Sequence, residues 1–166
     1  MTTAVPSLLD DWVRATAPQQ DQAAARERAE TQRERVSRLK DPFMPVAMND
    51  NSARAKETVL WEDDDTMVIV DAFAYGPKAL VIPKQETLFP TDLNAEGMQR
   101  LGVISARVSD AFIALGAKGP SRMWINPPSA LTVRQLHVHV QPGIARPGDA
   151  AAFYASMSEE LQNILG

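Results

Sequence analysis

The most informative segment of this sequence is Val133-Arg-Gln-Leu-His-Val-His-Val-Gln-Pro142. Side chains of a β-strand alternate between its two faces, so a strand here separates polar from apolar residues. The polar row is Gln135, His137, His139 and Gln141, and the apolar row is Leu136, Val138 and Val140. Both histidines of the chain fall in the polar row. We therefore expect a strand from Val133 to Val140 whose apolar side packs on the core and whose polar side carries the chemistry.

Three interpretations of the polar row compete. A solvated face of an ordinary antiparallel sheet would more typically carry Thr, Lys and Glu. A metal site is the second interpretation, because imidazoles two residues apart can share one ion, but it needs a third ligand from an Asp or Glu elsewhere. In the third, one imidazole acts as a nucleophile or acid–base group supported by neutral donors, which suits attack on a phosphoryl centre. We favour the third.

The rest of the chain predicts further strands and two amphipathic helices. The predicted strands are Val59–Trp61, Thr66–Asp71, Ala79–Pro83 and Arg122–Asn126, the first two forming a hairpin. Thr91 or Asp92 is a candidate cap for a long helix that Gly116 ends. The apolar positions of this helix recur at threes and fours: Met98, Leu101, Ile104, Val108, Ala111, Phe112 and Leu115. A last helix is predicted over Asp149–Leu165. The order of elements predicts an α+β domain with a mainly antiparallel sheet.

The N-terminal part differs in composition from the rest of the chain. Residues from about Pro6 to Leu39 are rich in Ala, Gln, Glu and Arg and predict helix, in two pieces around Pro18. Its arginines fit either an arm that binds phosphate or a partner, or a solvated helix face, and the interleaved glutamates favour the solvated face. A linker is then predicted by Pro42, Pro45 and Asn49–Ser52. We divide the chain into a helical extension with its linker, 1–57, and a working domain, 58–166.

Composition excludes several classes of protein. The chain has 166 residues, 45% of them hydrophobic and 23% charged, as expected of one globular domain. It has no cysteine, which excludes disulfides, thiolate zinc sites and a cysteine nucleophile. A net charge of −4 argues against a protein that coats nucleic acid. With no apolar run near the length of a membrane span and no signal-peptide pattern, we expect a cytoplasmic protein without a membrane span.

The polar row resembles the signature of the histidine triad (HIT) superfamily, His-x-His-x-His with apolar residues between, with Gln135 at the first triad position. The resemblance extends to Trp61–Asp71, to Leu80-Val-Ile-Pro-Lys84, to the long helix and to Asn126 ahead of the signature. It covers about residues 58 to 142. It implies a HIT-like α+β fold and pairing into a homodimer. The N-terminal and C-terminal helical extensions are predicted from the chain itself, and the N-terminal one has no assigned counterpart in the family.

The register of the resemblance determines which histidine is the nucleophile. With Gln135, His137 and His139 at the triad positions, the central nucleophilic role passes to His137. A second register, His137-Val-His139-Val-Gln141, resembles the nucleotidylyltransferase branch and would pass that role to His139. We favour His137, because Val133 then takes the usual apolar position. The Gln-Leu-His-Val-His-Val string also resembles the CDP-diacylglycerol pyrophosphatase branch.

The resemblance implies a reaction and a set of substrate contacts. A neutral imidazole attacks an α-phosphorus, a covalent nucleotidyl-histidine forms, and a main-chain carbonyl of the signature strand holds the ring tautomer. No cofactor is implied, and the ligand is a nucleotide or a nucleotide-like small molecule. Besides the triad positions, the resemblance implies Asp71 at the ribose, Ile69 (or Val68) at the base, and Gln141 as a donor to phosphate oxygens, and Asn126 is a further substrate-binding candidate. Because the loop before the signature departs from the family, further phosphate contacts are expected from Thr132, Arg134, Lys84 or Arg122.

The loop before the signature departs from the family pattern. Asn126-Pro-Pro-Ser-Ala-Leu-Thr132 is short, and its two prolines have no N–H to offer a phosphate. A nucleotide phosphoramidase or phosphodiesterase-type hydrolase, or a nucleotidyl transferase, is the function we expect. The alternative is a catalytically weak or inactive nucleotide-binding regulatory protein that engages a partner through its N-terminal helices.

Overall fold

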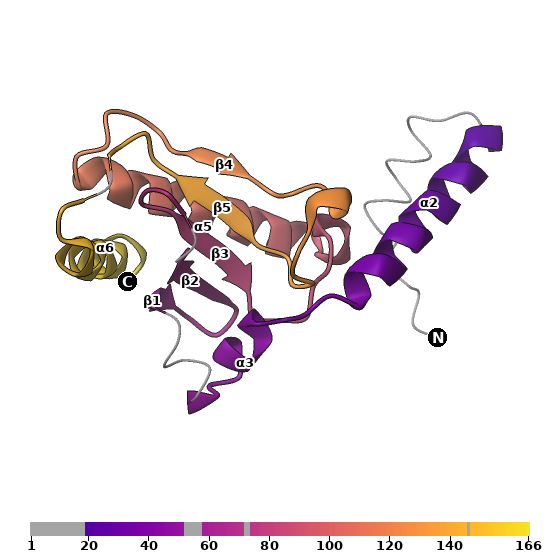
Figure 1. Cartoon of the computed structure of the whole chain (residues 1–166), viewed down its shortest axis with the longest axis horizontal. Coiled ribbons are helices and arrows are strands. Elements are labelled where there is room, and N and C mark those ends of the chain that lie inside the picture. The colour runs from indigo at the N-terminus through magenta and orange to yellow at the C-terminus, as the bar shows by residue number, and fades with distance from the viewer. Residues whose placement is uncertain (1–18, 52–57, 72–73, 146) are drawn as a thin grey trace.

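The computed structural model describes residues 19–51, 58–71, 74–145 and 147–166, with a five-stranded sheet at its centre (Figure 1). The strand order is β1-β2-β3-β5-β4, and every neighbouring pair is antiparallel. The strands are β1 (Val59–Glu62), β2 (Thr66–Val70), β3 (Ala79–Pro83), β4 (Arg122–Trp124) and β5 (Val138–Gln141). The predicted hairpin is β1–β2, and Asp63 Oδ1 accepts hydrogen bonds from the amides of Asp65 and Thr66 in its turn.

Helices flank this sheet. The α-helices of the described residues are α2 (Gln19–Ser37), α3 (Phe43–Ala47), α5 (Ala95–Ala114) and α6 (Ala150–Leu165), and the 3₁₀ helices are η1 (Pro90–Asp92) and η2 (Pro128–Ala130). The predicted α+β class, with a mainly antiparallel sheet and one long helix, is confirmed.

The long helix α5 begins later than the sequence predicts. Its N-cap is Asn94, whose side chain accepts a hydrogen bond from the amide of Gly97. The prediction of Thr91 or Asp92 as the cap is wrong, because both lie in η1, where Asp92 instead accepts from the amides of Leu88 and Phe89. At the other end, Gly116 adopts a φ of 102° and ends the helix as predicted.

Two apolar clusters lie on the sheet because neighbouring residues of a strand point to opposite faces. Helices α5 and α6 pack on the first face with Phe112, Val108, Met157 and Leu161 against Val68, Val81, Val138 and Val140. Helix α3 packs on the second face with Phe43, Val46 and Ala47 against Met67, Ile69, Leu80 and Ile82. Burial of each large apolar side chain contributes about 1.5–3 kcal/mol, so both helical layers stabilise the sheet.

The signature segment is only partly a strand. The prediction of a strand from Val133 to Val140 is wrong in its first half, since β5 begins at Val138. Upstream, the amide of Arg134 donates to Lys40 O and the amide of Leu136 donates to Thr87 O. These backbone partners lie outside the five strands. Residues 134–136 therefore form no regular ladder with β3 or β4, and the strand begins only after His137.

The N-terminal part is helical where it is described. Helix α2 falls within the predicted helical zone, and the predicted piece before Pro18 lies outside the described residues. Within the predicted linker, α3 is buried against the sheet. The division of the chain at residue 57 stays a prediction. No helix in the described part of the chain is long and apolar enough to cross a membrane.

Candidate active site

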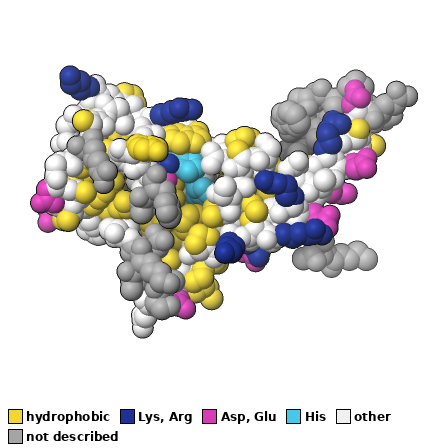
Figure 2. Space-filling model, viewed as in Figure 1, with side chains coloured by type: hydrophobic (Ala, Val, Ile, Leu, Met, Phe, Trp, Pro, Cys, Tyr) yellow, Lys and Arg dark blue, Asp and Glu magenta, His cyan; other side chains and the backbone are white. Residues whose placement is uncertain are grey.

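The two histidines lie next to each other on the face of the sheet that carries α3. His139 is in β5 and pairs with Leu80 of β3 and Trp124 of β4, and His137 directly precedes this strand. Their ring centroids are 4.7 Å apart in an edge-to-face arrangement. Both residues are buried, at 6% and 7% exposure, and Figure 2 shows histidine side chains reaching the surface beside hydrophobic ones. The site is thus a largely dry, partly accessible pair of imidazoles.

The tautomer of His137 is determined by its own backbone. Its Nδ1 lies 2.8 Å from the carbonyl oxygen of Gln135. Because a carbonyl only accepts, Nδ1 carries the proton and Nε2 keeps its lone pair. Burial lowers the pKa of His137, an effect that outweighs the opposing hydrogen bond to the Gln135 carbonyl. The ring of Phe43 contacts this imidazole edge-on at 5.4 Å. His137 is therefore a neutral imidazole with a free basic nitrogen at neutral pH.

A short chain of hydrogen bonds orients His139. Trp124 Nε1 donates to Asn126 Oδ1 at 3.1 Å, which turns the Asn126 amide nitrogen toward His139 Nε2, 3.2 Å away. The indole ring also stacks on the imidazole, with centroids 4.8 Å apart and planes inclined by 14°. Burial, followed by the nearby positive charges, lowers the pKa of His139 to about 4. His139 is neutral at pH 7, its Nε2 accepts, and its Nδ1 therefore carries the proton.

Asp71 completes the cluster together with a lysine that the sequence analysis missed. Asp71 Oδ2 lies 3.9 Å from His139 Nδ1 and 2.6 Å from Lys78 Nζ. The Lys78 Nζ is also 5.5 Å from the centroid of the Trp124 ring. Trp124 was likewise not predicted as a site residue. The available signal was position, since Lys78 precedes Leu80, the β3 partner of His139, by two residues.

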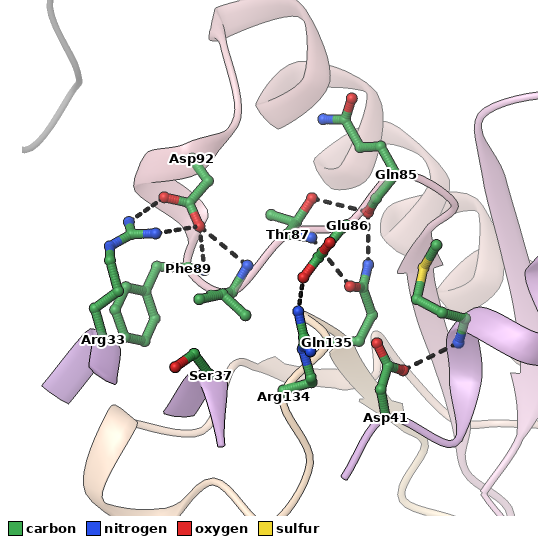
Figure 3. A network of polar contacts seen from close by, with 12 residues as sticks. Arg33, Ser37, Asp41, Gln85, Glu86, Thr87, Phe89, Asp92, Arg134 and Gln135 are labelled. Atoms are coloured by element: carbon green, nitrogen blue, oxygen red, sulfur yellow. Dashed lines mark hydrogen bonds and ion pairs between the residues drawn. The ribbon is translucent and has the colours of Figure 1, made fainter. Parts of the chain in front are cut away.

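Gln135 does not share the histidine face through its side chain. Its Nε2 donates to Gln85 O at 2.8 Å, and its Oε1 accepts from the amide of Thr87 at 3.0 Å (Figure 3). The same Nε2 also donates to Pro83 O at 2.7 Å. The residue is fully buried, at 0% exposure. The prediction that Gln135 shares a polar row with the histidines is therefore wrong, because residue 135 precedes β5, which begins at Val138. Gln135 reaches the site only by its main-chain carbonyl.

Four other predicted residues lie in different surroundings. Ile69 is buried in the apolar cluster under α3, and Thr132 is exposed at the end of the loop that contains η2. Gln141 is half-buried opposite Arg122. Lys84 forms an ion pair with Glu62 at 2.8 Å and lines a groove of about 520 Å³ whose other residues include Asp64 and Asp65 but neither histidine. Lys84 therefore does not join the histidine cluster.

Helix α2 holds the loop that precedes the histidines. Arg35 donates to the carbonyls of Pro128 at 2.8 Å and Ser129 at 3.3 Å. Arg33 forms an ion pair with Asp92 and lies over the Phe89 ring at 5.1 Å (Figure 3). The loop whose prolines lack N–H groups thus uses its carbonyls instead, as acceptors for a helix far away in sequence.

Comparison with known proteins identifies the family. A family model described as the HIT domain matches residues 52–145. The chain belongs to the HIT family. The matched region contains Asp71, Lys78, Asn126 and both histidines, whereas α2 and α3 lie before it and α6 after it. The comparison with curated protein sequences gives no match.

Solved structures agree with a HIT fold. A zinc-bound histidine triad family protein from Mycobacterium smegmatis has 25% identity and a TM-score of 0.62, covering 75% of this chain and 94% of that chain. A HIT-like protein involved in cell-cycle regulation from Bartonella henselae has 23% identity and a TM-score of 0.54, with coverage of 75% and 95%. A HIT family hydrolase from Legionella pneumophila has 23% identity and a TM-score of 0.51, with coverage of 64% and 95%.

The Mycobacterium smegmatis protein is zinc-bound. Across the residues described for the present HIT chain, no group of three His, Cys, Asp or Glu side chains is placed to hold a metal ion. The metal interpretation of the polar row therefore finds no ligand set here.

Proposed function

We propose that this HIT protein is a nucleotide hydrolase or nucleotidyl transferase that attacks an α-phosphate with Nε2 of His137. The hydrogen bond from His137 Nδ1 to the Gln135 carbonyl carries this proposal. It fixes the tautomer that leaves Nε2 unprotonated, so the nucleophile needs no separate base. Membership of the HIT family supports the same class of reaction.

The reaction proceeds in two displacements. Nε2 of His137 bonds to the α-phosphorus while the bond from phosphorus to the leaving group breaks. The leaving group departs with the electron pair of that bond, and an amine leaving group takes up a proton from solvent. Water, or an acceptor hydroxyl in a transferase, then attacks the same phosphorus, releases a proton to solvent, and breaks the N–P bond, whose electron pair returns to Nε2. A nucleoside monophosphate or its ester is released, and His137 returns to its starting state. Separating one hard displacement into two easier ones is what a covalent intermediate contributes.

His139 is the donor that faces the phosphoryl oxygens. Its Nδ1 carries a proton because its Nε2 accepts from Asn126. Within the described residues, this Nδ1 has no hydrogen-bond partner although it is buried. A buried donor without a partner is costly, so a phosphoryl oxygen placed there gains a strong hydrogen bond in the transition state.

The substrate we propose is a nucleoside phosphoramidate, a dinucleoside polyphosphate or a related nucleotide diester. Asp71, beside the two imidazoles, is the acceptor for ribose hydroxyls. Helix α2 of the N-terminal extension contacts loops of the HIT-like domain through Arg33 and Arg35. Because these two arginines already bind loops of the same chain, we favour the enzyme over a regulatory protein that engages a partner through its N-terminal helices.

We also propose a homodimer. Strand β4 is an edge of the sheet, and its Met123 is 45% exposed. On α5, Val103 is 49% exposed and Ile113 is 42% exposed. Apolar side chains on an unpaired edge strand and on the long helix favour pairing of two copies through both elements. Light scattering during gel filtration tests this, and a monomer at micromolar concentration contradicts it.

Variants of the two histidines test the proposed function. Adenosine and guanosine phosphoramidates and dinucleoside polyphosphates are incubated with the wild type, His137→Ala and His139→Ala. We expect His137→Ala to abolish mononucleotide release and the covalent nucleotidyl adduct in intact-protein mass spectra. His139→Ala should still form the adduct, but slowly. An adduct that persists in His137→Ala and is lost in His139→Ala would transfer the nucleophilic role to His139. Unchanged turnover in His137→Ala would refute the mechanism.

A further inference from the structure

Lys78 is a buried cation beside the two histidines. Its side chain is 15% exposed, and its Nζ lies 2.6 Å from Asp71 Oδ2 and 5.5 Å from the centroid of the Trp124 ring. Trp124 in turn stacks on His139 at 4.8 Å. The ammonium therefore belongs to the same cluster as the imidazoles, and the residues around it offer one carboxylate and one aromatic face.

The backbone fixes the position from which this lysine reaches the site. The amide of Asp71 donates to Lys78 O at 2.9 Å, which closes the loop between β2 and β3. The amide of Lys78 donates to Tyr154 OH of α6 at 3.4 Å. A lysine held at both its N–H and its C=O presents its side chain from a defined place at the start of β3. The ion pair with Asp71 offsets the cost of desolvating this partly buried ammonium, so the two side chains hold each other beside the histidines.

Lys78 and Arg122 are the cations whose contacts with the Trp124 ring place them near the histidines, but the Arg122 side chain is exposed, with its guanidinium carbon 4.9 Å from the ring centroid. Burial lowers the pKa of both imidazoles, and the charge of Lys78 adds to the lowering in each case. Neutral imidazoles suit a nucleophile but do not balance the charge of a phosphate. Asp71 adds a negative charge to the same cluster. An anionic substrate therefore needs the ammonium, both to neutralise Asp71 and to meet the phosphoryl oxygens.

We propose that Lys78 is the phosphate-binding cation of this site, and that it contacts non-bridging oxygens of the α-phosphoryl group. This proposal rests on the proposed function. An ammonium has three N–H donors, so the bond to Asp71 leaves donors for the substrate. As the α-phosphorus becomes five-coordinate, negative charge grows on those oxygens, and a fixed cation in a dry site stabilises it. Lys78 is thus a catalytic residue that recognises the phosphate rather than the base or the sugar.

Binding of ligands with and without a phosphate tests the proposal without any turnover. The probes are adenosine 5′-monophosphate and adenosine, titrated by calorimetry into the wild type, Lys78→Met, Lys78→Arg and the surface control Lys118→Met. We expect Lys78→Met to weaken binding of the monophosphate by about 10-fold or more and to leave adenosine within about 2-fold. Lys78→Arg keeps the charge and should retain most of the preference for the phosphate. Lys118 is exposed, and its replacement should change neither affinity.

Titration of the histidines by NMR is the second readout. The chain has two histidines, so two imidazole titrations report on the whole site. We expect Lys78→Met to raise the pKa of both, because a nearby positive charge that disfavours protonation is removed. The acid limb of the pH–rate profile should move to higher pH in the same variant. Lys78→Arg should leave these pKa values near those of the wild type.

The outcomes separate the two proposals. Equal weakening of adenosine and its monophosphate in Lys78→Met, or unchanged histidine titrations, would overturn the role of Lys78. A wild type that binds the monophosphate no better than adenosine would also overturn it, because no phosphate subsite would exist. Loss of the phosphate preference in Lys78→Met together with full turnover in His137→Ala would support Lys78 and refute the proposed nucleophile.

Discussion

Nδ1 of His137 lies 2.8 Å from the main-chain carbonyl of Gln135, while the side chain of Gln135 is directed away from the imidazoles. The residue at the first triad position therefore contributes to the site by its backbone alone. Its amide side chain holds the segment from Pro83 to Thr87, which packs beside the histidine segment. The tautomer of His137 does not depend on the chemical identity of the side chain at residue 135. What depends on that side chain is the stability of the surrounding loops.

We therefore predict that Gln135→Leu destabilises the fold. The substitution removes the Gln135 partner of the buried Pro83 carbonyl and of the buried Thr87 amide, and each such loss costs about 1–3 kcal/mol. The Gln85 carbonyl still accepts from the Thr87 hydroxyl. Urea unfolding should show a loss of about 2 kcal/mol or more, whereas the exposed Gln162→Leu should stay within about 0.5 kcal/mol of the wild type. Per folded molecule, turnover should be largely retained, because the carbonyl that orients His137 remains. A stable but inactive Gln135→Leu would contradict this division of roles.

Gln135→His rebuilds the full triad sequence, and we predict no gain in activity from it. A neutral imidazole offers one donor and one acceptor, so it cannot replace the two donors and one acceptor that the Gln135 amide uses. At least one of the three hydrogen bonds is lost, which costs about 0.5–1.5 kcal/mol in the free energy of unfolding. Comparison of kcat/KM and of urea midpoints with the wild type checks this. A Gln135→His variant with a higher kcat/KM and unchanged stability would contradict this prediction and show that Gln135 limits activity.

Helix α2 allows a prediction with a matched control on the same helix. Arg35 donates to carbonyls of the loop with η2, whereas Arg38 pairs with Glu34 on the exposed surface of α2. Arg35→Met should destabilise the protein by about 1 kcal/mol, and Arg38→Met by about 0.5 kcal/mol or less. Hydrogen exchange at the amides of Ala130 and Leu131, which close η2, should accelerate in Arg35→Met alone. Equal exchange in both variants would show that α2 does not hold this loop.

The fold and the location of the site were predictable because both depend on local patterns. Alternation along residues 137–141 places the two histidines on one face whatever lies around them. The first half of the predicted strand failed because the backbones of Lys40 and Thr87, distant in sequence, take the hydrogen bonds that a sheet would need. Such competition leaves no trace in the hydrophobic pattern of residues 133–136.

The side chains that complete the site were not predictable for a different reason. Lys78 has the sequence context of a solvated lysine in a turn, and only the closure of the loop onto Asp71 buries it. Phe43 lies between two prolines, a pattern typical of a linker, yet it contacts His137 because α3 fills the apolar face of β2 and β3. Both depend on which elements meet in three dimensions, and the chain order does not encode that locally.

The lowered pKa values of the two histidines predict how stability depends on pH. In the unfolded chain each imidazole takes up a proton as the pH falls through about 6.5, whereas in the folded protein His139 stays neutral until about pH 4. Between these values the unfolded state binds more protons, so the free energy of unfolding falls as the pH falls. Urea unfolding at about pH 7 and about pH 5 should show this loss, in a window where most carboxylates stay ionised. His139→Gln lacks the linked proton and should lose less stability across the window. If wild type and His139→Gln respond equally to pH, then His139 is not held neutral by burial in the folded site.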